Sequence, residues 1–98
     1  MFPIIPANTA TASFPENDEG IFGFGFKSPG GAQSMTNLVS NAGVVASDTA
    51  GVGTARYGLA ACEYGGDKGI FGYGETPGVF ISTTNLVSNA GVVASDTT

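Results

Sequence analysis

The chain has 98 residues, of which 42% are apolar and 11% charged, and three Lys or Arg against eight Asp or Glu give a net charge of −5. So few cations cannot neutralise many phosphates, which excludes nucleic acid as a partner and argues against an anionic membrane surface. No apolar run approaches the roughly 20 residues of a membrane span, and residues 1–6 are too short and lack the cationic start of a signal peptide. No compartment is indicated.

One block, TNLVSNAGVVASDT, occurs twice without a change, at residues 36–49 and 84–97. A shorter echo precedes it, because GIFGFG at 20–25 matches GIFGYG at 69–74. The blocks are offset by 48 residues and the echoes by 49, so the loop between them is one residue shorter in the second copy. A repeat unit must stack on copies of itself to bury its apolar faces. The chain is therefore predicted to hold two structural repeats.

In chain order, we expect an N-terminal segment at 1–14, a first unit at 15–50 and a second unit at 51–98. Two roles are open for the N-terminal segment. It is either a first strand of the first unit whose sequence has diverged, preceded by an unpaired end, or a strand that clasps a neighbouring chain by joining its sheet. Pro3 and Pro6 confine its beginning to a sheet edge, because proline cannot donate to a strand ladder.

Turn signals divide the second unit into four short β-like runs, predicted at 55–64, 69–75, 79–87 and 91–96. The turns between them contain glycine or proline, which supply the positive or fixed φ that a hairpin needs. Four strands in roughly 40 to 50 residues is the spacing of a propeller blade. The predicted fold class is all-β, with two four-stranded antiparallel propeller blades per chain.

The second run of each unit alternates side chains by size rather than by polarity. Aromatic rings are expected on one face and glycines on the other, and both faces are expected to be covered. We expect each blade to insert its rings against the glycines of the next. The residues of this inter-blade packing are Phe22, Phe24, Phe71 and Tyr73 with Gly23, Gly25, Gly72 and Gly74. Such a head-to-tail interface either closes into a ring or continues as a fibre.

The second unit resembles a kelch-repeat β-propeller over nearly the whole of 54–97. The resemblance rests on RYG at 56–58, GIFGYG at 69–74 and TNLV at 84–87. The chain departs from the family in having Gly-Tyr-Gly in place of a glycine doublet and in lacking the late tryptophan. The resemblance implies a ring of six or seven blades.

Two blades cannot close a propeller, which takes about four to eight. The chain is therefore expected to complete its propeller by association with itself. A homotrimer with six blades is the first expectation, because six is the only number favoured by the resemblance that divides by two. A homotetramer with eight blades is the second.

The chain has no histidine, which removes the usual general base and excludes a Ser-His-Asp or Cys-His set. No metal-ligand spacing or phosphate loop appears, so neither a cofactor nor catalysis is expected. The alternative is an enzyme that uses a ring of carboxylates, without the copper-ligating histidines of the galactose-oxidase branch of kelch-like folds. The single cysteine, Cys62, excludes an intrachain disulfide and is expected to be a small buried hydrophobe.

Four residues are candidates for ligand binding. Asp48 and Asp96 are equivalent in the two repeats, so a ring would display them in a circle that suits calcium or a cationic ligand. The alternative is that each caps the turn between blades. Arg56 beside Tyr57 suits a carboxylate or a sugar face, and the alternative is a bridge from Arg56 to an acidic loop of the neighbouring blade.

The leading functional hypothesis is a self-assembling propeller that acts as a structural or binding module for proteins or carbohydrates. One alternative is an engineered or excised two-blade fragment of a longer array, used to study propeller assembly. Another is a sugar-binding adhesin or lectin-like propeller, which rests on fold analogy alone.

Overall fold

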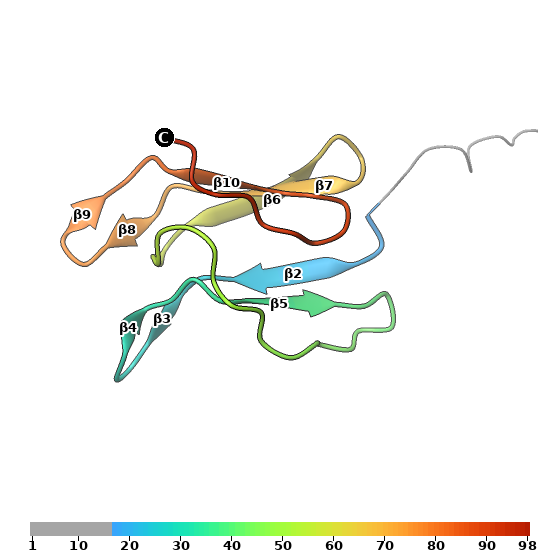
Figure 1. Ribbon diagram of the computed structural model, residues 1–98, viewed down its shortest axis with the longest axis horizontal. Helices are drawn as coiled ribbons and strands as arrows, with labels where there is room; N and C mark the ends of the chain where they lie inside the picture. The colour runs from blue at the N-terminus through green and yellow to red at the C-terminus, as the bar shows by residue number, and fades with distance from the viewer. Residues whose placement is uncertain (1–16) are drawn as a thin grey trace, which may run out of the picture.

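A computed structural model describes residues 17–98, and these residues form an all-β structure without a helix (Figure 1). Their nine strands make one three-stranded and three two-stranded sheets, and every pairing is antiparallel. The prediction of an all-β fold is confirmed. In the described part of the chain, no helix that could cross a membrane is found. The N-terminal segment expected at 1–14 lies outside the described residues.

The first repeat is a bent β-hairpin. Strand β2 (Gly20–Gly23) pairs with β5 (Thr36–Val39), and beyond a bend β3 (Phe26–Lys27) pairs with β4 (Gly31–Ala32). Pairing continues through the bend, because the Phe24 amide donates to the Met35 carbonyl at 3.0 Å. The hairpin therefore has a long arm, β2–β5, and a short arm, β3–β4.

The second repeat has the same bent hairpin and one further strand. Its long arm pairs β7 (Lys68–Gly72) with β10 (Thr84–Val87), and its short arm pairs β8 (Glu75–Thr76) with β9 (Val79–Phe80). Strand β6 (Ala60–Tyr64) pairs with the other edge of β7, which gives the order β10-β7-β6.

The difference of one residue between the repeats lies in the turn of the short arm. Three residues, 28–30, join β3 to β4, whereas two residues, 77–78, join β8 to β9. Both turns contain proline and glycine, which suit a tight reversal of the chain. The shortening deduced from the two offsets therefore falls where a hairpin tolerates it best.

The bend between the arms corrects the prediction of one continuous strand at 69–75. Phe24 and Tyr73 have φ values of 66° and 64°, and the glycines after them, Gly25 and Gly74, have φ values of 105° and 97°. Two successive residues with positive φ interrupt the alternation of side chains between the two faces of a strand. The rings of Phe24 and Tyr73 therefore do not continue the faces of Phe22 and Phe71, contrary to expectation.

The strand expected at 91–96 is also absent, so the described sheet of the second repeat has three strands rather than four. The loop after β10 makes only two bridges to it, Val87 with Val93 and Thr84 with Thr97. Between these bridges the loop carries one residue more than β10, which is the geometry of a β-bulge. The bulge leaves the ladder interrupted.

Two other predicted runs are divided in the structure. The run at 79–87 becomes β9 and β10, because the chain turns from the short arm back to the long arm between them. The run at 55–64 begins with two isolated bridges, in which Arg56 pairs with Gln33 and Tyr57 pairs with Glu75. Residues 51–59, which begin the second predicted unit and are here called the linker, thus touch both repeats before β6 begins.

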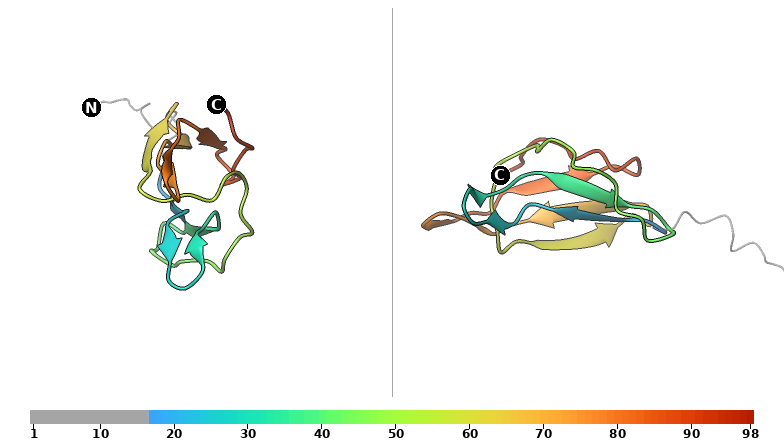
Figure 2. Two further views of the ribbon diagram at one scale, coloured as in Figure 1. Left: turned by 90° about the vertical axis from the view of Figure 1, so that its left-hand side faces the viewer. Right: turned by 90° about the horizontal axis from the view of Figure 1, so that it is seen from below.

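The long arms of the two repeats lie one over the other, as both views in Figure 2 show. The buried apolar side chains are Phe71, Val87 and Val93, all from the second repeat. Three half-buried side chains pack against them, Ile21 and Phe24 from the first repeat and Leu59 from the linker. The core of the described chain is therefore the contact between its two repeats.

Cys62 is exposed, so the prediction of a buried cysteine is wrong. Its strand, β6, lies at the edge of the sheet, and all five of its residues are exposed. The apolar neighbours that suggested burial are small alanines, Ala60 and Ala61, and they cover little surface.

Candidate functional site

The contact between the repeats joins two different faces of the same bent hairpin. Side chains alternate along a strand, and directly paired residues of neighbouring strands lie on the same face. In the first repeat, the face that meets the second repeat carries β2 residues and their β5 partners, here called face A: Ile21, Gly23, Thr36 and Leu38.

The second repeat presents its opposite face to this contact. Phe71 of β7 is buried, as is Val87, which pairs with Gly69. These side chains and their direct partners form the second surface of the contact, here called face B: Gly69, Phe71, Asn85 and Val87. The repeats therefore stack head to tail, face A against face B.

The ring of Phe71 occupies the space that Gly23 leaves open. A Cβ atom on Gly23 would lie 2.8 Å from Cζ of Phe71 and 3.0 Å from Cγ2 of Thr36, which is too close for any side chain. Phe71 is only 4% exposed, and its ring centroid lies 5.3 Å from that of Phe24 in a tilted arrangement. Gly23, Phe24 and Phe71 are thus brought together at the contact.

A second glycine contact lies further along the interface. A Cβ atom on Gly91, in the loop after β10, would lie 2.7 Å from Cδ2 of Leu38. Gly91 also has a φ of 79°, which side chains rarely adopt. The position requires glycine for its backbone and for the approach of Leu38.

Arg56 connects the linker to both repeats through hydrogen bonds and a cation–π contact. It is fully buried, and its guanidinium donates to the carbonyls of Tyr73 at 2.7 Å, Thr54 at 3.1 Å and Thr83 at 3.5 Å. Its Cζ atom lies 4.4 Å from the centroid of the Phe24 ring, which gives a cation–π contact with the first repeat. These contacts occupy the side chain, so Arg56 supports the fold and is closed to a ligand from solvent.

Burial lowers the pKa of Arg56, and the nearby Asp96 opposes this shift. Arginine has so high an ordinary pKa that the side chain stays protonated in proteins. Asp96, in the loop after β10, is the acidic group near enough to affect Arg56, but the described residues show no ion pair from Arg56 to an acidic loop.

Tyr57, the other expected partner of a sugar or carboxylate, is half-buried. Its ring lies edge-on to Phe26, with centroids 5.2 Å apart and planes at 74°. This contact joins the linker to the short arm of the first repeat. Arg56 and Tyr57 are adjacent in sequence, but their side chains serve different contacts.

Asp48 and Asp96 each accept a hydrogen bond from the equivalent asparagine of their own repeat. Asp96 accepts hydrogen bonds from Asn85 Nδ2 at 2.8 Å and from the amide and hydroxyl of Thr54 at 3.1 and 2.6 Å. Asp48 accepts one from Asn37 Nδ2 at 2.7 Å. Hydrogen bonds from Thr54 and then Asn85 lower the pKa of Asp96. Asp96 thus bonds to the segment between the repeats, as the turn-capping alternative expects, whereas the hydrogen bond to Asp48 in the described chain comes from Asn37 of its own block.

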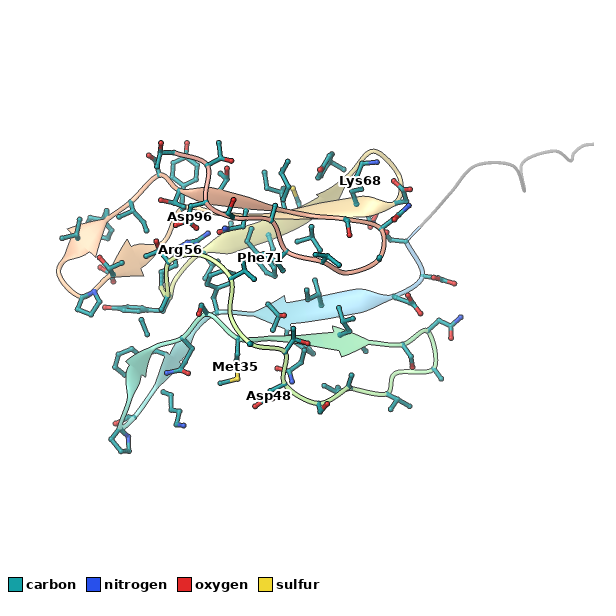
Figure 3. The ribbon with its side chains drawn as sticks, in the orientation of Figure 1. Met35, Asp48, Arg56, Lys68, Phe71 and Asp96 are labelled. Atoms are coloured by element: carbon teal, nitrogen blue, oxygen red, sulfur yellow. The ribbon has the colours of Figure 1, made fainter. Side chains whose placement is uncertain are left out.

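The labelled side chains in Figure 3 show Asp48 and Asp96 on separate repeats, each beside its own loop. Within residues 17–98, no group of three or more Cys, Asp or Glu side chains is arranged to hold a metal ion. The pair therefore does not meet within one chain.

Five predicted packing residues lie away from the contact between the repeats. Phe22 is 65% exposed, on the outer face of the first repeat, and Gly72 lies on the outer face of the second. Gly25 and Gly74 form the bends of the hairpins, and neither receives an aromatic ring: a Cβ atom on Gly25 would meet nothing within 4 Å, and one on Gly74 would lie 2.8 Å from the carbonyl oxygen of Tyr57 and 3.0 Å from Cβ of Leu59. Tyr73 contributes its carbonyl to Arg56, while its own side chain is 62% exposed.

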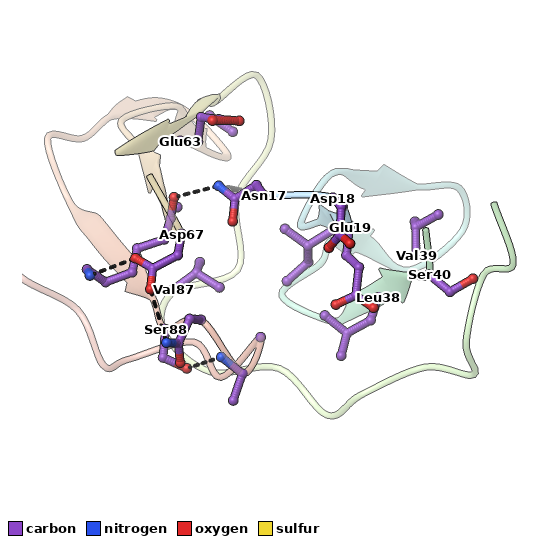
Figure 4. A pocket seen from close by; sticks show the side chains of 18 of the residues that line it. Asn17, Asp18, Glu19, Leu38, Val39, Ser40, Glu63, Asp67, Val87 and Ser88 are labelled. Carbon is purple, nitrogen blue, oxygen red and sulfur yellow. Dashed lines mark hydrogen bonds and ion pairs between the residues drawn. The ribbon is translucent and has the colours of Figure 1, made fainter. Parts of the chain in front are cut away.

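A groove of about 620 Å³ opens between the repeats at the end opposite the short arms (Figure 4). Leu38 and Val87 line it between the two sheets, and Asn17 donates to the Lys68 carbonyl across it at 3.3 Å. Its rim carries the carboxylates of Asp18, Glu19, Glu63 and Asp67.

The carboxylates of this rim are partly committed to contacts within each repeat. Asp67 accepts from Lys68 Nζ at 2.9 Å and from Asn89 Nδ2 at 3.1 Å, and these bonds lower its pKa, Lys68 first. The same ion pair raises the pKa of Lys68. Asp18 accepts an equivalent hydrogen bond from Asn41 Nδ2 at 3.3 Å, so the bond between Asn89 and Asp67 has a counterpart in the first repeat.

Sequence reasoning missed three features of the structure: the Leu38–Gly91 contact between the repeats, the buried position of Arg56 and the pairing of each asparagine with an aspartate inside its own block. One signal was available for the first and third. Leu38, Gly91 and the Asn–Asp pairs all belong to the identical blocks, whose polar residues recur as pairs rather than singly. No such signal marks Arg56, which occurs once.

No protein-family model matches the chain, and no curated protein or solved structure is significantly similar to it.

Proposed function

We propose that this chain is a self-assembling β-propeller module, which closes a ring with further copies of itself and serves as a structural or binding body without catalytic activity. One observation carries the proposal. Phe71 is 4% exposed inside the contact between the repeats, whereas the equivalent Phe22 is 65% exposed on the outer face of the first repeat. The chain thus repeats a hydrophobic contact surface that it can cover only once.

A second equivalent pair differs in the same direction. Val93 is 9% exposed, whereas Val45 of the first repeat is 53% exposed. Exposed apolar area of this kind favours association, at about 25 cal/mol for each Å² removed from water. Because the contact joins unlike faces, copies added in the same way build a ring or a fibre and not a symmetric pair.

The resemblance of the second repeat to kelch propellers supports a closed ring of six blades, which is a homotrimer. A ring of eight blades, a homotetramer, is the second choice. In either ring, the charged side chains that were candidates for ligand binding already make structural hydrogen bonds. Arg56 donates to backbone carbonyls, and Asp48 and Asp96 accept from asparagine side chains. This distribution favours a module whose outer loops meet proteins or carbohydrates over an enzyme.

The solution mass tests the proposal directly. Static light scattering after size exclusion is expected to give three times the 9.8 kDa mass of the chain. Four times that mass would select the tetramer. A monodisperse single chain at micromolar concentration would overturn the proposal, and a broad series of growing species would replace the ring with a fibre.

A further inference from the structure

We infer that neighbouring chains meet in the register of the in-chain contact, with Phe22 of one chain packed on Gly72 of the next and Leu86 of that next chain packed against Gly43 of the first. This inference rests on the proposed self-assembly and defines the contact through which it proceeds. It assigns face B of the first repeat and face A of the second as the two halves of one interface.

The residues needed for this contact are already present, without a change of type. Face A of the second repeat, directed outward, carries the same four residues as the covered face A of the first: Ile70, Gly72, Thr84 and Leu86. Face B of the first repeat likewise carries the same four residue types as the covered face B of the second, with Val39 in the place of Val87, Phe22 for Phe71 and Asn37 for Asn85. The fourth, Gly20, takes the place of Gly69. The in-chain contact is therefore a template for the contact between chains.

The two glycines that would receive side chains are open. A Cβ atom on Gly72 would approach only Cγ2 of Thr84, at 3.4 Å, and one on Gly43 would meet nothing within 4 Å. Their equivalents Gly23 and Gly91 are filled by the partner repeat at 2.8 and 2.7 Å. The space that a ring or a leucine occupies inside the chain is free at each outer face.

The side chains that would enter these spaces are exposed. Phe22 is 65% exposed and Leu86 is 43% exposed, whereas Leu38, the covered equivalent of Leu86, is half-buried. Thr36 differs from Thr84 in the same way: it is 3% exposed on the covered face A, whereas Thr84 is only half-buried. Each outer position has lost the cover that its inner equivalent has.

One component of the in-chain contact is not duplicated by the sequence. Arg56 lies over the Phe24 ring, but the position equivalent to Arg56 in the first repeat is 7, which is alanine, and Phe24 is replaced by Tyr73 in the second. No cation–π contact of this kind can form between chains from those positions. The contact between chains is therefore weaker than the contact within one.

Disulfide trapping tests the register. The variant Gly43→Cys/Leu86→Cys is made in a Cys62→Ala background and exposed to oxidised glutathione. Its matched control is Leu38→Cys/Gly91→Cys in the same background. Within the chain, Cγ of Leu38 lies 3.4 Å from a Cβ built on Gly91, so the sulfur of a cysteine at 38 reaches one at 91. Gly43 and Gly91 have φ values of 81° and 79°, so both variants carry the same backbone strain.

On a non-reducing denaturing gel, the control is expected to stay at the mass of one chain with no free thiol. The Gly43→Cys/Leu86→Cys protein is expected to run as covalent multiples that end at the ring size and return to one chain on reduction. A crosslinked control beside an uncrosslinked test protein, with an oligomeric wild type, would overturn the register and leave self-assembly standing. A monomeric wild type would overturn both.

A second variant does not depend on disulfide geometry. Phe22→Ala is expected to lower the assembled fraction at least tenfold, whereas Phe80→Ala is expected to leave it unchanged. Phe80 is 86% exposed, more than Phe22, but its equivalent in the first repeat is Ala32 and it belongs to the short arm. Equal loss of assembly in the two variants would show that general surface hydrophobicity, not this register, holds the chains together.

Discussion

The two copies of the fourteen-residue block have identical local structure and different surroundings. In both, a serine hydroxyl accepts hydrogen bonds from the amides two and four residues later, Ser40 in the first copy and Ser88 in the second, at 3.1 to 3.2 Å. Yet Asn85 is fully buried and Asn37 is only half-buried. Local sequence determines the shape of each repeat, and the neighbouring repeat determines what is buried.

This comparison separates two kinds of contribution to stability. Contacts inside one block are present twice, so they stabilise each repeat equally. Contacts between the repeats are present once within the chain, although the side chains for them are present twice. The difference in stability between matched substitutions at equivalent positions therefore measures what the adjacent repeat contributes.

The largest difference is expected for the phenylalanine pair. Phe71→Ala removes a buried ring and leaves a cavity, which should lower the free energy of unfolding by about 3–5 kcal/mol. Phe22→Ala, at a position 65% exposed, should lower that of the isolated chain by less than about 1 kcal/mol. Urea denaturation at a concentration where both proteins are monomeric measures the difference. Equal losses would mean that the contact seen within the chain does not stabilise it.

Arg56 has no equivalent in the first repeat, so its substitution measures a stabilising contact that is present only once in the described chain. Arg56→Met keeps the apolar stem but leaves three backbone carbonyls without their donor, which should lower the free energy of unfolding by about 2–4 kcal/mol. The control Lys27→Met, on an exposed residue, should change it by less than about 0.5 kcal/mol. Thermal and urea unfolding would both report the effect, and a neutral Arg56→Met would contradict the role of Arg56 in the fold.

The glycine pair should show a smaller difference. Gly43→Ala and Gly91→Ala both place a side chain at positive φ, which costs about 1–2 kcal/mol at each position. Only Gly91→Ala also pushes against Leu38 within the chain, which should add about 1–3 kcal/mol. Urea unfolding of the monomeric variants checks the order, and a Gly43→Ala protein less stable than Gly91→Ala would reverse the assignment of the covered face.

The smallest effect is expected from the aspartate pair. The pKa of Asp96 is lowered in the folded chain, so its contribution to stability is present above the ordinary aspartate pKa of about 3.9 and is lost as the pH falls through the lower, folded value. Because Asp96 is exposed and solvent screens it, Asp96→Asn should cost only roughly a few tenths of a kcal/mol at neutral pH.

The pH dependence provides the sharper measurement for Asp96. Stability is measured from pH 6 to pH 2, where the Asp96→Asn protein should lose less stability than the wild type as the acid range is entered. Asp48→Asn serves as the comparison, because Asp48 accepts from its asparagine but receives no bond from the linker. Parallel curves for the wild type and the Asp96→Asn protein would contradict the contribution of the Thr54 and Asn85 hydrogen bonds.

Much of the local structure could be predicted from the residues. The turns at glycine and proline, the repeated hairpin and the all-β fold follow from short-range preferences that act in each copy alone. The glycine at position 23 signalled a close approach, because a strand interior rarely lacks a side chain without a reason. The ends of the strands were harder to predict from the sequence, because Phe24 and Tyr73 adopt a positive φ that their residue types do not favour.

By itself the sequence determined the number of repeats, their all-β character and the turns between their short strands, because these depend on residues close together along the chain. Only the tertiary structure decided which copy of Phe22 and Phe71 is covered, that Arg56 is buried and that Gly91 meets Leu38. The physical reason is that burial depends on the neighbouring repeat. Two identical blocks contain no information about which of their two faces is covered, and in the structure the first contributes Thr36 and Leu38 to the contact and the second Asn85 and Val87.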